Sequence, residues 1–170
     1  MLETPSIPRY SPNGSDNPTG ADNQQERLAL LGYLAGIIDG EGWVGISKTK
    51  RADVRAGFIF LPQISIHMVG KDAIEHIDAT FRKVDLPSYY VHRKDTSQWT
   101  VNGYKRVVEV LEVLLPYLHI KRRQGELILA MNDLRSQRHH HSSPTELEHE
   151  IRAWICQLNS KGKNPQRLYA

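Results

Sequence analysis

Apolar positions recur with two different periods along the chain, and the places where the period changes predict the order of the elements. Residues 24–39 carry apolar side chains at helical spacing, and the glycines that follow end the pattern, so a helix is expected to stop at Asp39. From Trp43 apolar and polar residues alternate, which predicts a strand, and a second alternating run starts at Phe58 after a basic turn. The first part of the chain therefore predicts a helix followed by a β-hairpin.

The same order recurs in a looser form further along the chain. The remaining expected elements are a helix at residues 71–84, short strands at 89–94 and 98–101, and helices at 104–115, 121–138 and 143–158. Ser142 or Ser143, just before Pro144, is expected to cap the last helix. This order predicts an α+β domain in which helices cover one face of an antiparallel sheet and leave the other face free.

The two hairpins place a set of polar side chains on that free face. By alternation the set is Ser47, Thr49, Arg51, Gln63, Ser65 and His67 from the first hairpin, and His92, Lys94, Gln98 and Thr100 from the second. None is acidic, and a two-stranded ribbon with such side chains fits the major groove of DNA, where they can read base edges. Any half-exposed sheet also alternates polar with apolar residues, so the pattern alone leaves both interpretations open.

Composition and charge narrow the class of protein without giving its function. The chain has 170 residues, which favours one domain, expected at residues 25–159 between a disordered leader at 1–24 and a flexible basic tail at 160–170. Its formal net charge of +3 is too small to show by itself that the partner is a polyanion. The single cysteine excludes an intrachain disulfide framework.

The sequence shows neither a membrane-spanning segment nor a secretory signal, and the expected cellular compartment follows from this. The longest apolar run is shorter than the roughly 20 residues needed to span a bilayer, and the first residues do not have the order of a secretory signal. The protein is therefore expected in the cytoplasm of a prokaryote or in an organellar matrix, and it is not expected to be secreted or bound to a membrane.

The segment YLAGIIDGEG at residues 33–42 carries the most information in the chain. Gly32, Gly36 and Gly40 recur every four residues, so they line one side of the helix and present almost no side chain there. A second helix backbone can approach such a side closely, as it does in small-xxx-small packing. If that helix is the same segment of a second copy, two-fold symmetry brings two Glu41 carboxylates together at the helix ends.

A pair of carboxylates at that point has both a cost and a chemical use. The two charges repel each other and oppose the negative end of each helix dipole, and a divalent cation resolves both. Oxygen ligands from Glu41, the backbone carbonyl of Gly40, water and phosphate suit Mg²⁺, which keeps much of its hydration and can activate water toward phosphorus. A lone acid after a helix is more often a solvated helix end, so the chemistry alone leaves this interpretation open too.

Residues 34–42, LAGIIDGEG, resemble the LAGLIDADG signature of a family of homing endonucleases. The matching positions are Leu34, Ala35, Gly36, Ile38, Asp39 and Gly42, and the mild substitutions are Ile37, Gly40 and Glu41. The likeness in element order extends over residues 25–132. The segment LPYLHIKRRQ at residues 115–124 resembles the one that supplies the active-site lysine of the family, which would be Lys121.

The resemblance implies the αββαββα fold of the homing endonucleases, with a saddle-shaped antiparallel sheet on double-stranded DNA and extra C-terminal helices. It implies cleavage of both strands of a long near-palindromic target that depends on Mg²⁺, or on another divalent cation such as Mn²⁺. Family members with one copy of the motif act as homodimers, so an intron-encoded homodimer is expected here. Two alternatives stay open: a maturase that binds intron RNA on the same fold, and a noncatalytic DNA-binding regulator.

The same resemblance assigns roles to individual residues. Glu41 is expected to be the catalytic metal ligand together with the Gly40 carbonyl, Lys121 to act near the scissile phosphate, and Asp39 to orient the helix end. The expected dimer interface consists of Gly32, Leu34, Ala35, Gly36 and Asp39. At Gly70 the sequence departs from the family, which commonly has a polar side chain there to help hold active-site water.

Overall fold

The computed structural model describes residues 20–93, 95–139 and 142–160. In chain order its elements are α1 (Gly20–Glu41), β1 (Gly42–Lys50), β2 (Phe58–Met68), α2 (Lys71–Lys83), β3 (Tyr90–His92), β4 (Ser97–Asn102), α3 (Tyr104–Leu114), the 3-10 turn η1 (Leu115–Tyr117), α4 (Arg122–Ser136) and α5 (Glu146–Asn159). Most of the leader expected at residues 1–24 and nearly all of the expected tail lie outside the described residues, and residues 20–24 belong to α1. No helix among the described residues is both long enough and apolar enough to cross a membrane.

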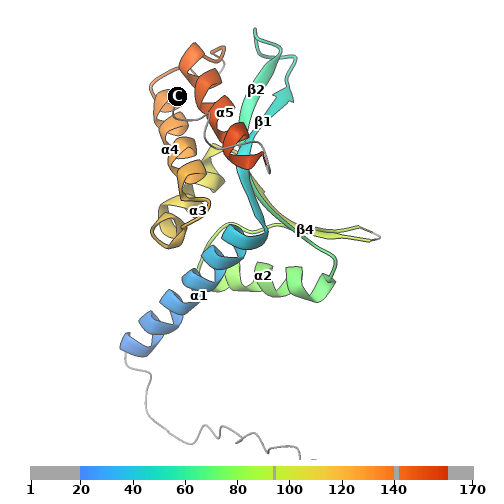
Figure 1. Ribbon diagram of the computed structural model, residues 1–170, viewed down its shortest axis with the longest axis vertical. Helices are drawn as coiled ribbons and strands as arrows, with labels where there is room; N and C mark the ends of the chain where they lie inside the picture. The colour runs from blue at the N-terminus through green and yellow to red at the C-terminus, as the bar shows by residue number, and fades with distance from the viewer. Residues whose placement is uncertain (1–19, 94, 140–141, 161–170) are drawn as a thin grey trace, which may run out of the picture.

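The four strands form one antiparallel sheet in the order β1-β2-β4-β3. The central strand β2 pairs with β1 along most of its length and with β4 over its last six residues, so it joins the two hairpins. Figure 1 shows the β1–β2 hairpin and β4 leading away from their shared end in different directions, with the helices on the outer side of this bend. The predicted α+β fold is confirmed.

The core lies between the sheet and the helices, and it fixes the end of α1. Leu34, Ala35 and Ile38 of α1 have no exposed surface, and their spacing of three and four residues places them on one side of the helix. Beneath the other hairpin, Trp99 of β4 stacks on Phe81 of α2 with ring centroids 4.0 Å apart. Full burial of each large apolar side chain stabilises the fold by roughly 1.5–3 kcal/mol.

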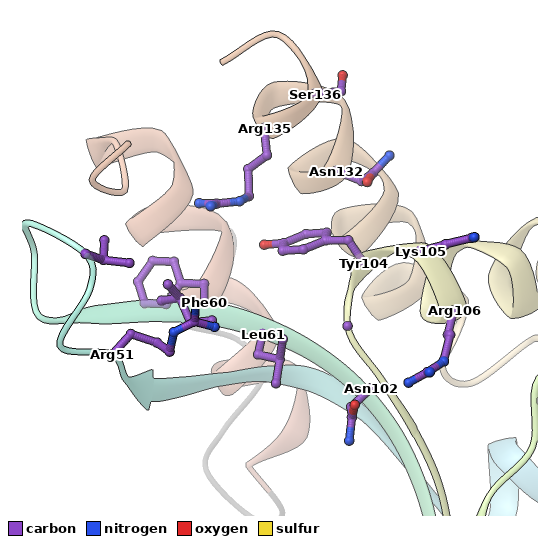
Figure 2. A pocket seen from close by; sticks show the side chains of 13 residues that line it. Arg51, Phe60, Leu61, Asn102, Tyr104, Lys105, Arg106, Asn132, Arg135 and Ser136 are labelled. Atoms are coloured by element: carbon purple, nitrogen blue, oxygen red, sulfur yellow. The ribbon is translucent and has the colours of Figure 1, made fainter. Parts of the chain in front are cut away.

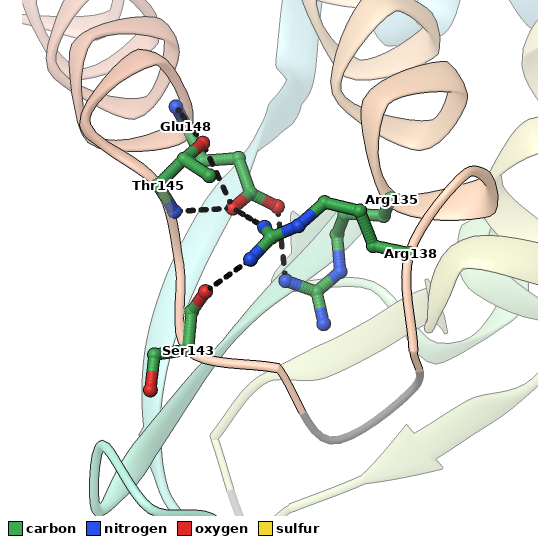
Figure 3. A network of polar contacts seen from close by, with 5 residues as sticks. All are labelled: Arg135, Arg138, Ser143, Thr145 and Glu148. Carbon is green, nitrogen blue, oxygen red and sulfur yellow. Dashed lines mark hydrogen bonds and ion pairs between the residues drawn. The ribbon is translucent and has the colours of Figure 1, made fainter.

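A single buried carboxylate fastens α5 to α4. Thr145 caps α5 in a capping box with Glu148, so the expected serine cap was placed two or three residues too early. Glu148 has no exposed surface, and it also accepts hydrogen bonds from Arg135 at 3.0 Å and Arg138 at 2.8 Å (Figure 3). Placing the cap at Thr145 lets one carboxylate serve both the helix end and the two guanidinium groups.

Candidate active site and nucleic-acid interface

Helix α1 runs into β1 without a loop, and Glu41 stands at the junction. Gly42 makes this junction possible, because a Cβ there would lie 2.5 Å from the carbonyl oxygen and 2.8 Å from the Cα of Ile38. Backbone atoms cannot move aside as a flexible side chain can, so the position requires glycine. The Glu41 side chain is exposed and makes no hydrogen bond or ion pair within the described part of the chain. Its carboxylate is therefore available to a ligand.

The neighbouring acid, Asp39, is buried and fully engaged. Its Oδ2 accepts the backbone N–H of His119 and its Oδ1 accepts the backbone N–H of Lys121, both at 2.8 Å. These bonds join the end of α1 to the segment between η1 and α4, about eighty residues further along the chain. Both carboxylate oxygens of Asp39 are therefore occupied by backbone donors, and its expected role in orienting the helix end stays a prediction.

The same contact ties the backbone of Lys121 to the last turn of α1. The carboxylate of Asp39 holds the backbone of Lys121, and Glu41 follows Asp39 by two residues. The two cations after Lys121 are already occupied: Arg123 and Arg122 donate to Glu126 and lower the pKa of that carboxyl group. The half-buried Lys121 side chain has no acidic partner among the described residues, so its charge is available to an incoming anion.

The oxygen donors at this point suit a hard divalent cation but do not complete a site. Among the described residues, no group of three or more His, Cys, Asp or Glu side chains is placed to hold a metal ion. One chain offers the Glu41 carboxylate and the backbone carbonyl of Gly40, which lies in the last turn of α1 where carbonyls lack partners within the helix. Mg²⁺ takes oxygen ligands and needs few from the protein, so these residues fit part of a magnesium site.

The glycine face of α1 is exposed, and it differs in part from the expected dimer interface. A Cβ built at Gly32, Gly36 or Gly40 meets no atom within 4 Å, so this side of the helix is bare. Leu34 and Ala35, by contrast, have no exposed surface because they lie on the opposite side of α1, in the core of the chain. These two residues have no surface to offer a partner, and Asp39 is occupied by its backbone contacts.

Strand pairing defines the side chains on the open face of the sheet. Residues directly opposite each other in an antiparallel pair share a face. Starting from the pairs Ser47↔Leu61 and Ser65↔Thr100, the open face comprises Trp43, Gly45, Ser47 and Thr49 of β1, Ile59, Leu61, Gln63, Ser65 and His67 of β2, and Gln98, Thr100 and Asn102 of β4. Seven of the ten polar residues expected on this face are there: Ser47, Thr49, Gln63, Ser65, His67, Gln98 and Thr100.

The other three expected residues do not have that placement. His92 is opposite Ser97, on the helix-covered side, and it contacts the Ser97 hydroxyl at 2.8 Å and Glu75 of α2 at 3.4 Å. The expectation for His92 is wrong because the register of β3 on β4 puts Val91, not His92, beside Gln98. Arg51 lies beyond the end of β1, where it pairs with Asp53, and Lys94 lies outside the described residues.

The open-face residues differ in how accessible their polar groups are. Ser65 is only 2% exposed, and the hydroxyls of Ser47 and Thr100 donate to the backbone carbonyls of Leu61 and Ile64. His67 is exposed and Gln63 and Gln98 are partly exposed, and none of the three makes a side-chain hydrogen bond within the described residues. The accessible recognition groups therefore lie mainly along β2 and β4.

Sequence analysis missed an aromatic residue on this face, two positions after Glu41. Trp43 is 36% exposed, and its ring lies over Gly45, where a Cβ would come within 2.4 Å of the ring carbon Cζ2. The indole N–H has no acceptor within the described residues. A tryptophan at the start of an alternating strand looks like a core residue, but its pairing with Ser65 assigns it to the open face.

At Gly70 the family commonly has a polar side chain, and this chain has none. Gly70 is the N-cap of α2, and no side chain caps that helix. A Cβ at this position would meet only the Cβ of Ala73, at 3.9 Å, which is ordinary contact. A polar side chain would therefore fit at Gly70 without rearrangement, so steric constraints do not require glycine at this position.

Comparison with known proteins gives a consistent structural match and no match to a sequence family. No protein-family model matches the chain. The homing endonuclease I-CvuI, in complex with the I-CreI target in the presence of 2 mM Mg and with the DNA not cleaved, is similar over 82% of this chain and 88% of its own, with 18% identity and a TM-score of 0.66. The archaeal intron-encoded homing endonuclease I-Vdi141I, complexed with DNA, is similar over 79% and 87%, with 20% identity and a TM-score of 0.64.

A third solved structure has a much longer chain. The LAGLIDADG homing endonuclease I-LtrWI, bound to its target DNA, is similar over 83% of this chain but only 48% of its own, with 22% identity and a TM-score of 0.60. This chain thus corresponds to nearly all of I-CvuI and to about half of I-LtrWI.

Proposed function

We propose that this protein, whose fold is that of one LAGLIDADG homing-endonuclease domain, is a site-specific endonuclease that cuts both strands of a DNA duplex. The observation that carries the proposal is the placement of Glu41. An exposed carboxylate without a partner in the described residues stands at the end of a bare glycine-lined helix face, and Asp39, two residues earlier, binds the backbone N–H of Lys121. The structural neighbours bound to DNA support the same activity.

The assembly that fits this geometry is a homodimer. One chain supplies one Glu41, and a metal-dependent cut in each strand needs oxygen ligands on both sides of the dyad. Pairing two copies through the bare faces at Gly32, Gly36 and Gly40 brings two Glu41 side chains together. The match to the full length of I-CvuI and to half of I-LtrWI is consistent with one such domain per chain here.

Within that assembly each group has a separate task. Mg²⁺, or another divalent cation such as Mn²⁺, bound by Glu41 and the Gly40 carbonyl would supply Lewis acidity at the scissile phosphate. The ammonium group of Lys121 stabilises the negative charge that develops on the phosphate oxygens. The open-face side chains of β2 and β4 contact base edges and fix the register of the duplex. I-CvuI has been crystallised on DNA with 2 mM Mg and with 2 mM Ca, which supports the choice of a divalent cation.

The first experiment selects cleaved molecules from a library of random duplexes with the purified full chain and Mg²⁺. Wild-type protein should enrich one near-palindromic sequence, and Glu41→Gln should cut that sequence at least about a hundredfold more slowly while keeping its affinity for it. Glu112→Gln, which changes an exposed glutamate of α3, is the matched control and should cut normally. Chelation of the metal should stop cleavage by the wild type.

Two results would count against the proposal. Cleavage by Glu41→Gln at the wild-type rate would remove Glu41 from the chemistry. Tight binding to the RNA of a surrounding intron, with no duplex enriched from the library, would replace the endonuclease with a maturase.

A further inference from the structure

A cavity of about 570 Å³ lies between the tip of the first hairpin, the start of α3 and the end of α4 (Figure 2). None of its lining residues comes from α1, so it is separate from the site at Glu41. The part of the lining from the first hairpin is mainly apolar and includes Val54 and Phe60, and the part from α3 and α4 carries polar and cationic side chains. The cavity therefore suits a ligand that has both an apolar part and a polar part.

Tyr104, the first residue of α3, supplies an unused donor to this cavity. Its hydroxyl oxygen is buried and has no hydrogen-bond partner within the described residues. Burial raises the pKa of Tyr104 well above its ordinary value, so the phenol stays protonated at neutral pH and its O–H can only be satisfied by an acceptor. Figure 2 shows this hydroxyl and the Arg135 guanidinium directed into the same space.

Cationic side chains outnumber acidic ones around the cavity. Glu148 is shared by Arg135 and Arg138, so one buried anion faces two cations. Only Nη1 of Arg135 is bonded to Glu148, and its other guanidinium N–H groups have no acceptor among the described residues (Figure 3). Lys105 and Arg106 in the first turn of α3 also lack an acidic partner there, and the lining contains no acidic residue.

The buried hydroxyl of Tyr104 and the unpaired N–H groups of Lys105, Arg106 and Arg135 are all hydrogen-bond donors, and three of these four side chains carry positive charge. We propose that the cavity binds a phosphate group, held by Tyr104 and Arg135, with the rest of the ligand against the apolar lining from the first hairpin. Arg is suited to phosphate because its planar fork can donate two parallel hydrogen bonds. The phosphate belongs either to a free phosphomonoester such as a nucleotide or to the backbone of a bound duplex. The inference does not depend on the nuclease activity, because it rests on residues outside that site.

The test compares thermal unfolding of the full chain in sodium phosphate, in adenosine monophosphate and in sodium chloride at equal ionic strength. For wild-type protein the unfolding temperature should rise with phosphate or nucleotide beyond its value in chloride, because a ligand that binds only the folded state stabilises it. Tyr104→Phe keeps the ring under Arg135 and removes only the hydroxyl, and it should weaken the apparent affinity for the probe on the order of tenfold. Arg106→Gln should weaken it as well.

Tyr89→Phe, which removes an exposed phenol outside this cavity, is the matched control and should respond to phosphate as the wild type does. In a parallel measurement, lower affinity of Tyr104→Phe for duplex DNA, without any response to phosphate or nucleotide, would assign the phosphate to the DNA backbone. The inference is overturned if Tyr104→Phe responds to phosphate, to nucleotide and to duplex DNA as the wild type does. It is also overturned if the wild type responds to none of these three probes, and in either case the cavity holds water only. These outcomes leave the cleavage assay with Glu41→Gln unaffected.

Discussion

At the scale of single residues, the region around Glu41 depends on small side chains that make room for specific neighbours. Gly42 allows the helix to pass directly into the strand, because any Cβ would overlap the backbone of Ile38. Gly45 leaves space for the ring of Trp43, which would otherwise be displaced. Both glycines lie beside exposed functional groups, so their absence of a side chain shapes the surface that a ligand meets.

Trp43 is expected to contact DNA next to the cleaved bond, because it lies on the open face two residues after Glu41. In the random-duplex selection, Trp43→Ala should change the preferred bases nearest the cut and weaken affinity for the preferred sequence by about 1–3 kcal/mol, the size of one good contact with a base edge in a duplex. Preferences at positions read by Ser47 and Thr49, which lie farther along β1 from Glu41, should persist because these side chains remain in place.

Trp154→Ala is the control for this prediction, since Trp154 is similarly exposed, at 45%, but lies on α5. It should leave the selected sequence unchanged. Identical enriched sequences from wild type and Trp43→Ala would show that Trp43 does not touch the bases.

At the scale of elements, one carboxylate couples two segments that are far apart in the chain. Asp39 in the last turn of α1 binds the backbone before α4, and this contact joins Lys121 to the end of the helix that carries Glu41. A similar arrangement at the other end of the molecule joins α4 to α5 through Glu148. In both contacts a buried carboxylate accepts hydrogen bonds from donors on another segment. Hydrogen bonds are directional, so they fix the relative orientation of the two segments more closely than apolar packing alone does.

Asp39→Asn should separate positioning from binding. The amide can accept only one of the two backbone N–H groups and presents its own N–H₂ to the other, so the free energy of unfolding should fall by about 1.5–3 kcal/mol. Single-turnover cleavage should fall much more than duplex affinity, because Lys121 loses its fixed place.

Asp133→Asn, an exposed change on α4, should alter neither quantity and serves as the control. Equal losses in cleavage and in affinity would contradict a positioning role for Asp39, because a lysine that is only misplaced should still attract the duplex.

At the scale of the whole molecule, the sheet and the bare side of α1 present two surfaces with different tasks. The open face carries polar side chains, and the glycine face of α1 is bare; in the proposed function the first binds a duplex and the second binds another copy of the chain. Both surfaces end near Glu41, so dimer formation and DNA binding would complete the same site. The cavity at Tyr104 lies away from Glu41 and from the glycine face of α1, and it borders the open face of the sheet at Ile59, Leu61 and Asn102.

Gly36→Leu tests this arrangement by sedimentation. Nothing lies within 4 Å of a Cβ at Gly36, so the single chain should fold at least as well as before, since leucine favours a helix more than glycine does by about 1 kcal/mol. Two helices in close contact through this face cannot accommodate the larger side chain, so the variant should sediment as a monomer and lose cleavage.

Ala73→Leu, at an exposed position of α2, should remain dimeric and active. A wild-type protein that sediments as a monomer at the concentrations at which it cuts DNA would exclude the homodimer.

The sequence by itself determined the order of the elements, the motif around Glu41 and the face of most residues in β1 and β2. These features follow from local periodicity, because side chains of a strand alternate and those of a helix recur about every four residues. The strand register decided the side of His92, and contacts across the fold decided the burial of Leu34 and the cavity at Tyr104. Tertiary structure also tied Lys121 to Asp39 in the last turn of α1, through a bond between residues about eighty positions apart. Local periodicity does not specify which distant groups meet, because that depends on how the elements pack together.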